Sequence, residues 1–169
     1  MSRVIVHRTK LDGVLLIEPP TRFEDFRGTY VELYNENLYR EAGITDIFVQ
    51  DDCSVSRRHV LRGIHGDNKT TKLISCLSGT IYVIVVNNDP ASYQFRDWAS
   101  FTLSDKSKIQ LYIPPKIGNS YLVMSDHAVY YYKQTTNYDG SAQFTIKWND
   151  PTYNFYWPIK NPILSERDA

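Results

Sequence analysis

The sequence KLISCLSGTIYVIVV, residues 72–86, carries the clearest information on the fold of this chain. Two apolar runs, Lys72–Leu77 and Thr80–Val86, flank Ser78-Gly79, a dipeptide that favours a turn. The second run consists almost entirely of Val and Ile, which is typical of a strand buried on both faces. We therefore predict two consecutive strands that form a hairpin in the core.

Similar apolar runs recur along the rest of the chain with turn residues between them. Near the N-terminus, two runs flank the turn dipeptide Asp12-Gly13, and Pro19-Pro20 ends the second run because proline cannot donate to a sheet ladder. Strands outside the core hairpin are expected over residues 4–6, 14–17, 29–34, 46–56, 60–65, 98–103, 109–113, 118–124, 128–135 and 143–148. Many short strands with regular turns predict an all-β sandwich, jelly roll or barrel.

Residues 19–43 are expected to contain the irregular part of the fold. Phe23–Gly28 is predicted to form a polar turn, and Asn35–Gly43 a short helix with Asn35 as its N-cap and Gly43 as its stop. At 169 residues, the chain is expected to be one domain over residues 1–169 with one hydrophobic core.

The composition limits the classes of partner. The 19 basic and 19 acidic residues cancel, so there is no broad electrostatic basis for binding nucleic acid or an anionic membrane. No apolar run approaches the roughly 20 residues that cross a bilayer, and the N-terminus lacks the apolar core of a signal peptide. With only Cys53 and Cys76 present, we expect a soluble protein of the reducing cytoplasm.

A polar stretch, Phe48–Lys72, lies between runs that read as buried strands. It places Arg62, Gly63 and His65 within four residues, and Lys72 follows at the start of the next strand. Histidine titrates near neutral pH and can act as a base, while a lysine can stabilise a developing oxyanion. This combination suits proton abstraction next to a carbonyl, although a histidine in a strand is more often structural.

The spacing of Arg62 and His65 bears on the geometry of this stretch. A straight strand would point residues three positions apart to opposite faces. We therefore expect a bulge at Gly63, or His65 at the end of the strand; alternatively, Arg62 faces outward and contacts phosphate at the rim.

Two other strands carry polar side chains on a single face. Alternation places Tyr130 and Tyr132 on one face and Tyr131 with Lys133 on the other, which makes Tyr132 either an acid or an ordinary core tyrosine. Tyr30 and Glu32 also share a face, which is either a binding face or a solvated one.

Several pieces of the sequence together resemble the dTDP-4-dehydrorhamnose 3,5-epimerase (RmlC-like) family of nucleotide-sugar epimerases. In family order they are FEDFRGTYVE (residues 23–32), FVQDD (48–52), LRGIH (61–65), TTKL (70–73), YIPP (112–115), YYYK (130–133), WND (148–150) and LSERD (164–168). The resemblance implies a cupin-type jelly roll that acts without a cofactor or metal, and a homodimer in which the N-terminal hairpin is exchanged between subunits.

The resemblance also implies roles for individual residues. His65 paired with Asp168 would abstract the proton, Lys72 would stabilise the enolate oxygen, and Tyr132 would return a proton from the opposite face. By sequence alone, Asp168 belongs to a solvated tail. The positions that match the family's nucleotide and diphosphate contacts are Arg27, Glu32, Gln50, Arg62 and Tyr138. Their neighbour Tyr30 is also expected to bind the substrate.

The chain departs from the family at two places near the predicted site. Gly118-Asn119-Ser120 follows the Ile-Pro strand where the family usually has a histidine, and Gly66-Asp67 follows LRGIH where the family has an aromatic residue and Gln. This pairing resembles the branch that acts on GDP-linked 4-keto-heptoses for bacterial capsules. Because the amide of Asn119 carries no titrating proton, we expect efficient inversion at C3 and slow or no inversion at C5.

Other classes of protein are weighed against this one. A metal-dependent cupin would need nearby histidines of the His-x-His type, whereas position 67 is Asp. A ketoisomerase of related fold would also use His and Tyr, but the FEDFRG and LRGIH context favours an epimerase. The alternatives that stay open are a dTDP-4-keto-6-deoxyhexose 3,5-epimerase and a noncatalytic nucleotide-sugar-binding cupin.

Overall fold

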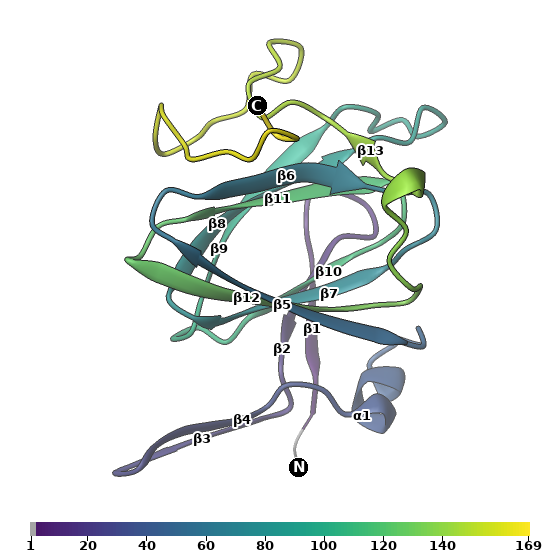
Figure 1. The fold of residues 1–169 in the computed structure, drawn as a ribbon. Helices are drawn as coiled ribbons and strands as arrows, with labels where there is room; N and C mark the ends of the chain where they lie inside the picture. The colour runs from purple at the N-terminus through teal and green to yellow at the C-terminus, as the bar shows by residue number, and fades with distance from the viewer. Residues whose placement is uncertain (1–2) are drawn as a thin grey trace.

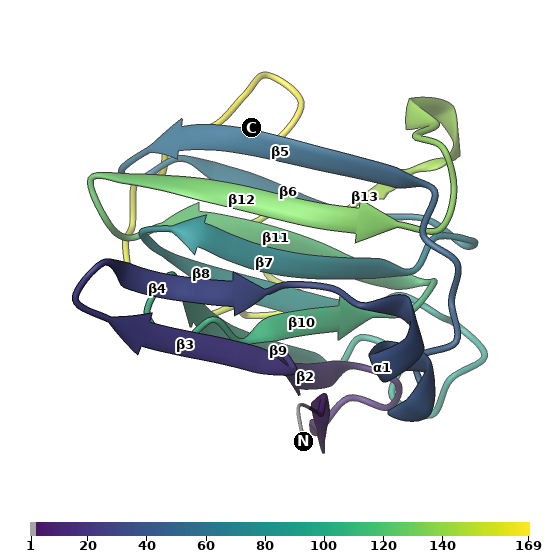
Figure 2. The same cartoon turned by 90° about the horizontal axis from the view of Figure 1, so that it is seen from below.

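The computed structural model describes residues 3–169, which form two β-sheets packed face to face (Figure 1). In spatial order, the larger sheet contains β1 (Ile5–Arg8), β2 (Leu15–Glu18), β10 (Gln110–Ile113), β7 (Lys72–Ser78), β12 (His127–Gln134) and β5 (Gln50–Arg57). Figure 2 shows this sheet from its outer side. The smaller sheet contains β13 (Phe144–Thr145), β6 (Leu61–Gly66), β11 (Ile117–Val123), β8 (Thr80–Asn87) and β9 (Trp98–Ser104). The predicted all-β sandwich is confirmed.

The core between the two sheets is built from alternate side chains of their inner strands. Ile74 of β7 and Leu111 of β10 pack from one sheet against Val83 and Val85 of β8 from the other, and all four are fully buried or nearly so. Removing this apolar area from water is the main favourable contribution to folding.

The predicted hairpin over residues 72–86 is wrong, although both of its strands exist. β7 pairs with β10 and β12, whereas β8 pairs with β11 and β9, so the chain passes from one sheet to the other at Gly79. Gly79 has a φ of +81° and approaches the backbone oxygen of His127 too closely for a Cβ. The two apolar strands thus cover one core from opposite sides instead of pairing with each other.

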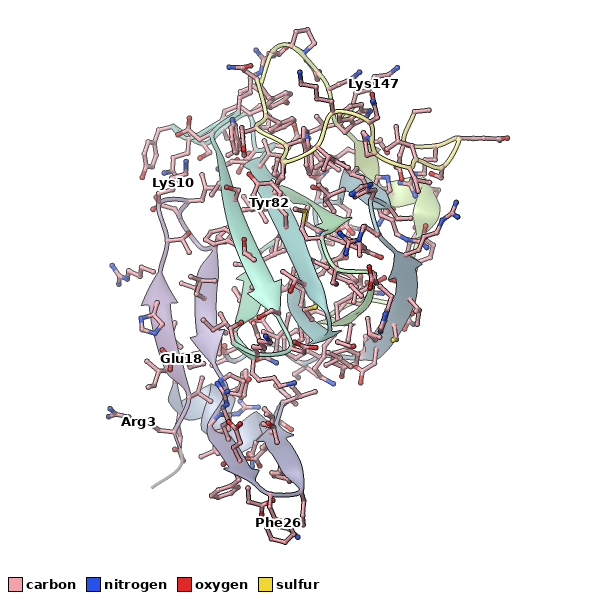
Figure 3. The ribbon with its side chains drawn as sticks, turned by 90° about the vertical axis from the view of Figure 1, so that its left-hand side faces the viewer. Arg3, Lys10, Glu18, Phe26, Tyr82 and Lys147 are labelled. Atoms are coloured by element: carbon pink, nitrogen blue, oxygen red, sulfur yellow. The ribbon has the colours of Figure 1, made fainter. Side chains whose placement is uncertain are left out.

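A separate hairpin, β3 (Thr21–Asp25) and β4 (Gly28–Glu32), extends away from the sandwich (Figure 1). The polar turn expected over Phe23–Gly28 is wrong, because residues 23–25 belong to β3. Phe23 pairs with Tyr30 across the hairpin and stacks on its ring at 6.5 Å, a cross-strand aromatic contact that favours the strand pair. At the tip, Phe26 is 98% exposed (Figure 3).

The predicted helix is present as α1 (Glu36–Glu41). The Asn35 side chain accepts a hydrogen bond from the backbone N–H of Leu38, as an N-cap does, and Gly43 follows the helix with a φ of +93°. Tyr39 of α1 is fully buried against Ile17 and Leu73, on the outer side of the larger sheet. Its hydroxyl contacts Gln110 and the Leu33 carbonyl.

The C-terminal segment after β13 lies over the smaller sheet (Figure 1). Tyr153, Phe155 and Trp157 pack against Ile84 and other side chains of the outer face. The strand expected over residues 143–148 is therefore only Phe144–Thr145. Farther on, Ile163 forms backbone hydrogen bonds with His59 and Leu61, which brings residues 163–168 alongside β6. No helix among residues 3–169 is long and apolar enough to cross a membrane.

Candidate active site

A cavity of about 520 Å³ opens between β5, β12 and β7 of the larger sheet and β6 and β11 of the smaller one. Its wall contains both charged and aromatic side chains: Gln50, Asp52, Cys53, Ser54, Arg62, His65, Lys72, Asn119, Tyr121, Tyr130, Tyr132, Tyr138, Gln143, Ser165, Arg167 and Asp168. All four predicted catalytic residues therefore line one cavity.

A bulge in β6 directs both Arg62 and His65 into this cavity. On β11, Asn119 pairs with His65 and Tyr121 with Arg62, so two residues of β6, Gly63 and Ile64, oppose one residue of β11. Gly63 within the bulge has a φ of +102°, and a Cβ there would lie 2.6 Å from the Asn119 carbonyl oxygen. The bulge predicted at Gly63 is confirmed, and it resolves how two residues three positions apart reach one site.

His65 is held by a carboxylate from the C-terminal segment. Its Nε2 lies 2.7 Å from Oδ1 of Asp168, which is only 5% exposed, and the other carboxylate oxygen accepts a hydrogen bond of 3.0 Å from Ser165. Burial lowers the pKa of His65, assisted by the positive charges of Arg167 and Lys72, while Asp168 opposes this shift. The imidazole is therefore neutral near pH 7 and able to accept a proton.

Lys72 begins β7 and points into the same cavity. Its Nζ lies 5.3 Å from the ring centroid of Tyr132. Burial lowers the pKa of Lys72, and the carboxylates of Asp67 and Asp52 counter that effect. A cation placed in this partly desolvated position can stabilise an oxyanion more strongly than one in bulk water.

Tyr130 and Tyr132 share the inner face of β12, as the alternation predicts. Tyr130 is buried, stacks on Tyr121 at 4.2 Å and accepts a hydrogen bond of 3.2 Å from Nδ2 of Asn119. Tyr132 is more accessible, and burial together with the charge of Asp52 raises the pKa of its phenol. The phenol stays protonated at neutral pH and can donate its proton.

His65 and Tyr132 come from different sheets and both line the cavity between them. Lys72 lies beside Tyr132. An imidazole, an ammonium group and a phenol are side chains that can serve as a base, a cation and an acid. Within residues 3–169, no three His, Cys, Asp or Glu side chains group together as a metal site requires.

The sequence pattern of the family described as dTDP-4-dehydrorhamnose 3,5-epimerase matches residues 8–169. The chain belongs to this family. The protein of that name from Salmonella typhimurium is 36% identical over 171 residues, which cover 98% of this chain and 93% of the relative. Membership confirms the predicted class of enzyme, a nucleotide-sugar epimerase, and the predicted RmlC-like cupin fold.

Solved structures of related epimerases have the same fold. The RmlC epimerase of Legionella pneumophila, in complex with dTDP-4-keto-L-rhamnose, is 34% identical with a TM-score of 0.92, over 98% of this chain and 90% of that one. ChmJ, a 3'-monoepimerase from Streptomyces bikiniensis in complex with dTDP-quinovose, is 25% identical with a TM-score of 0.89, over 96% and 84%.

In this epimerase, the predicted nucleotide contacts fall into two groups. Arg62, Gln50 and Tyr138 line the cavity, where the Gln50 amide oxygen accepts a hydrogen bond of 2.9 Å from the Tyr138 N–H. Arg27, Tyr30 and Glu32 lie instead on the β3–β4 hairpin and line no part of it. For these three, a binding role within the same subunit is not supported.

The hairpin residues have local partners instead. Arg27 pairs with Asp25 at 2.7 Å, and Glu32 accepts hydrogen bonds from Thr21 and Asn35. Tyr30 is 64% exposed.

Of the two places where a departure from the family was expected, Asn119 lines the cavity, whereas Gly66 and Asp67 do not. Asn119 stands opposite His65 on β11 and is 8% exposed. At Gly66, a Cβ would lie 2.5 Å from the Phe144 ring of β13, so this ring occupies the space that a side chain at position 66 would need. Burial alone would raise the pKa of Asp67, but hydrogen bonds from the N–H groups of Lys69 and Thr70 lower it, so the residue adds a negative charge.

Sequence analysis missed several residues that line the cavity. Asp52 and Ser54 share the half-buried face of β5 and line the cavity, a signal that period-two reading could have used; exposed Cys53 also contributes to the lining. Arg167 reaches the cavity next to Asp168 through the folded-back C-terminal segment, and no local pattern in the sequence predicts that position.

Proposed function

We propose that this enzyme epimerises a nucleotide-linked 4-keto sugar at C3 by proton transfer. The C–H bonds beside the carbonyl are acidified, so His65 removes the C3 proton through the ring nitrogen that does not contact Asp168. The electron pair moves into an enolate whose C4 oxygen interacts with Lys72. Tyr132 then donates its phenolic proton to C3 from the opposite face, and the ketone reforms with C3 inverted.

The observation that carries this proposal is the placement of the base and the acid. His65 with its Asp168 partner belongs to β6, and Tyr132 with Lys72 beside it belongs to the other sheet. A noncatalytic binding module would not need a neutral, carboxylate-oriented imidazole opposite a protonated phenol. The chemistry consists of proton transfers alone, so a base, a cation and an acid are sufficient for it.

Two substrate classes are proposed for this site. The first is a dTDP-linked 4-keto-6-deoxyhexose, which is supported by the names of relatives such as the Salmonella typhimurium protein and by the Legionella pneumophila complex. The second is a GDP-linked 4-keto-heptose of capsule biosynthesis, which is supported by Gly66-Asp67 and by Asn119 at the places where this chain departs from the family.

Asn119 also bears on the number of centres that are inverted. Its amide donates to Tyr130 and stands opposite His65, where it can hold a hydroxyl or carbonyl oxygen but cannot exchange a proton near neutral pH. We therefore propose inversion at C3, with slow or no inversion at C5.

A homodimer accounts for the hairpin residues that lie away from the cavity. The hairpin projects into solvent with Phe23, Phe26 and Tyr30 exposed, which is unusual for aromatic side chains of an isolated domain. In the proposed dimer, the β3–β4 hairpin reaches the cavity of the partner and supplies Arg27, Tyr30 and Glu32 to the nucleotide. The N-terminal hairpin that was expected to be exchanged is β1–β2, which pairs with β10 of its own sheet. Closed two-fold symmetry would complete both sites in the same way.

The test is incubation in D2O with dTDP-4-keto-6-deoxyglucose and, separately, with a GDP-4-keto-heptose, followed by NMR of the product. We expect deuterium and inversion at C3 with at least one of them. The His65→Asn variant should lose this exchange while it keeps its affinity for the nucleoside diphosphate. Binding of both sugars without deuterium uptake would instead identify a noncatalytic binding protein.

A further inference from the structure

Arg62 lines the cavity as a cation without a carboxylate partner. Among residues 3–169, it forms no ion pair with an aspartate or a glutamate. Its side chain donates instead through Nε to Oγ of Ser56, at 3.2 Å. The two terminal nitrogens of the guanidinium group therefore stay available for an anion such as a diphosphate, which an arginine can bind through both of them.

Ser56 is itself held by a tyrosine from the other sheet. It is 5% exposed and lies on β5, and its Oγ lies 3.3 Å from Oη of Tyr121 on β11. The same Oη lies 2.7 Å from Oγ of Ser54. Because Ser56 accepts from Arg62, its own proton can be donated to Tyr121, and the phenol can in turn donate to Ser54. One hydroxyl group thus connects two serines of the larger sheet with an arginine of the smaller sheet.

The strand pairing and a second tyrosine fix the position of Tyr121. Tyr121 pairs directly with Arg62 across β11 and β6, which places the two side chains next to each other. It is 4% exposed, and its ring stacks on that of Tyr130 at 4.2 Å with an angle of 13° between the planes. A ring that is buried and stacked in this way gives Ser56 a hydrogen-bond partner in a fixed place.

From this geometry we infer that Tyr121 is a positioning residue for Arg62. Its hydroxyl group holds Ser56, and Ser56 holds Nε of the guanidinium group, so that the two terminal nitrogens are directed at the diphosphate of the substrate. This inference rests on the proposed function. It adds a residue that sets the affinity for the diphosphate and acts through Arg62.

The physical reason for an effect on affinity is preorganisation. An arginine side chain has many rotamers, and ordering it at the moment of binding lowers the affinity for the ligand. Hydrogen bonds from Ser56 and Tyr121 order the side chain before the ligand arrives. None of these hydrogen bonds involves His65, Lys72 or Tyr132, so proton transfer should not depend on them.

The test measures the Kd of dTDP and of GDP by calorimetry in the wild type, Tyr121→Phe, Arg62→Ala and the double variant. Tyr121→Phe keeps the stacked ring and loses only the hydroxyl group. We expect it to raise the Kd of the diphosphate that the wild type binds by about fivefold, the effect of one lost hydrogen bond. With the 4-keto sugar substrate, KM should rise while kcat stays within about twofold of the wild type. In the Arg62→Ala background, Tyr121→Phe should have no further effect on Kd.

Tyr82→Phe is the matched control, because the Tyr82 hydroxyl group donates to the Tyr156 carbonyl on the outer face of the smaller sheet and lines no part of the cavity (Figure 3). We expect it to keep the Kd of the wild type. Ser56→Ala removes the acceptor of Arg62 directly and should raise Kd by a similar factor, and urea unfolding will check that each variant is folded. An unchanged Kd in Tyr121→Phe, or the same loss with and without Arg62, would overturn the positioning role.

The proposed epimerase would fail in a different measurement. Binding of dTDP and GDP is measured without turnover, whereas the epimerase is tested by deuterium exchange at C3. The predicted loss of affinity in a protein that exchanges neither sugar would support the role of Tyr121 and contradict the epimerase. A wild type that binds neither diphosphate would overturn both.

Discussion

Nε2 of His65 and Oδ1 of Asp168 lie 2.7 Å apart although 103 positions separate the two residues in the sequence. The contact depends on the C-terminal segment, which Ile163 ties to β6 through backbone hydrogen bonds with His59 and Leu61. Ser165 donates to the second carboxylate oxygen and fixes its direction. The carboxylate can therefore set the tautomer of the ring and stabilise the imidazolium formed during proton transfer.

Asp168→Asn is expected to reduce kcat by about a hundredfold or more, because it removes the charge that orients and stabilises the protonated base. KM should change little, since Asp168 acts through His65. The measurement is the initial rate of C3 deuterium exchange at saturating substrate. A variant with the kcat of the wild type would show that the pair serves only to anchor the C-terminus.

The acid limb of the profile of kcat/KM against pH reports the protonation state of His65. Burial lowers its pKa below the ordinary value of about 6.5, so the base stays neutral to lower pH than an exposed histidine does. We expect kcat/KM to hold constant at neutral pH and to fall only below about pH 6.5. A limb at higher pH would show that the charge of Asp168 outweighs burial.

Tyr132→Phe is expected to separate proton removal from inversion. His65 can still abstract the C3 proton, but the phenol proposed to return a proton from the other face has been removed. Deuterium exchange with retention should therefore continue, while inversion falls by about a hundredfold. NMR of both the residual substrate and the product measures the two rates. Inversion at the rate of the wild type would make Tyr132 a core residue.

Asp52→Asn tests the electrostatics around the acid and the lysine. The charge of Asp52 raises the pKa of Tyr132 beyond the effect of burial, and it also supports the charged form of Lys72. Its removal lowers both pKa values, so the alkaline limb of kcat should move to lower pH. The measurement is kcat against pH on the alkaline side, with Asp51→Asn as the control. Asp51 pairs with Lys133 instead of lining the cavity. An identical limb in the wild type and in Asp52→Asn would contradict the assignment.

The sequence predicts most strands and part of the site, because both depend on local patterns. Period-two alternation correctly places Tyr130 and Tyr132 on the inner face of β12. The spacing of Arg62 and His65 leaves three alternatives open, and a bulge at Gly63 is the one that the structure has. The N-cap of α1 is equally local, since Asn35 contacts Leu38 three positions later.

Features that depend on distant contacts are not predictable in this way. Ser78-Gly79 looks like a hairpin turn, but whether two strands pair or separate into different sheets is decided by their other neighbours, here β10 and β11. The β3 strand is missed because Phe23 is stabilised mainly by Tyr30 across the hairpin. From local pattern alone, Asp168 reads as a solvated tail residue, and only the family resemblance predicts its contact with His65.

The exposed hairpin leads to a prediction about how two subunits share a site. If Arg27 of one subunit completes the cavity of the other, Arg27→Ala should weaken binding of the nucleoside diphosphate, and light scattering should show twice the 19.6 kDa mass of one chain.

Arg27→Ala and His65→Asn are each expected to be weakly active or inactive. In a mixed dimer, one cavity would carry both substitutions and the other would carry neither. After unfolding and refolding the two variants together in equal amounts, about one quarter of the wild-type activity should return, because one site in four is then intact. Arg22→Ala, on the same hairpin, is the control for its folding. If Arg27 acted within its own subunit, every cavity in the mixture would carry one of the two substitutions, and refolding them together would restore nothing.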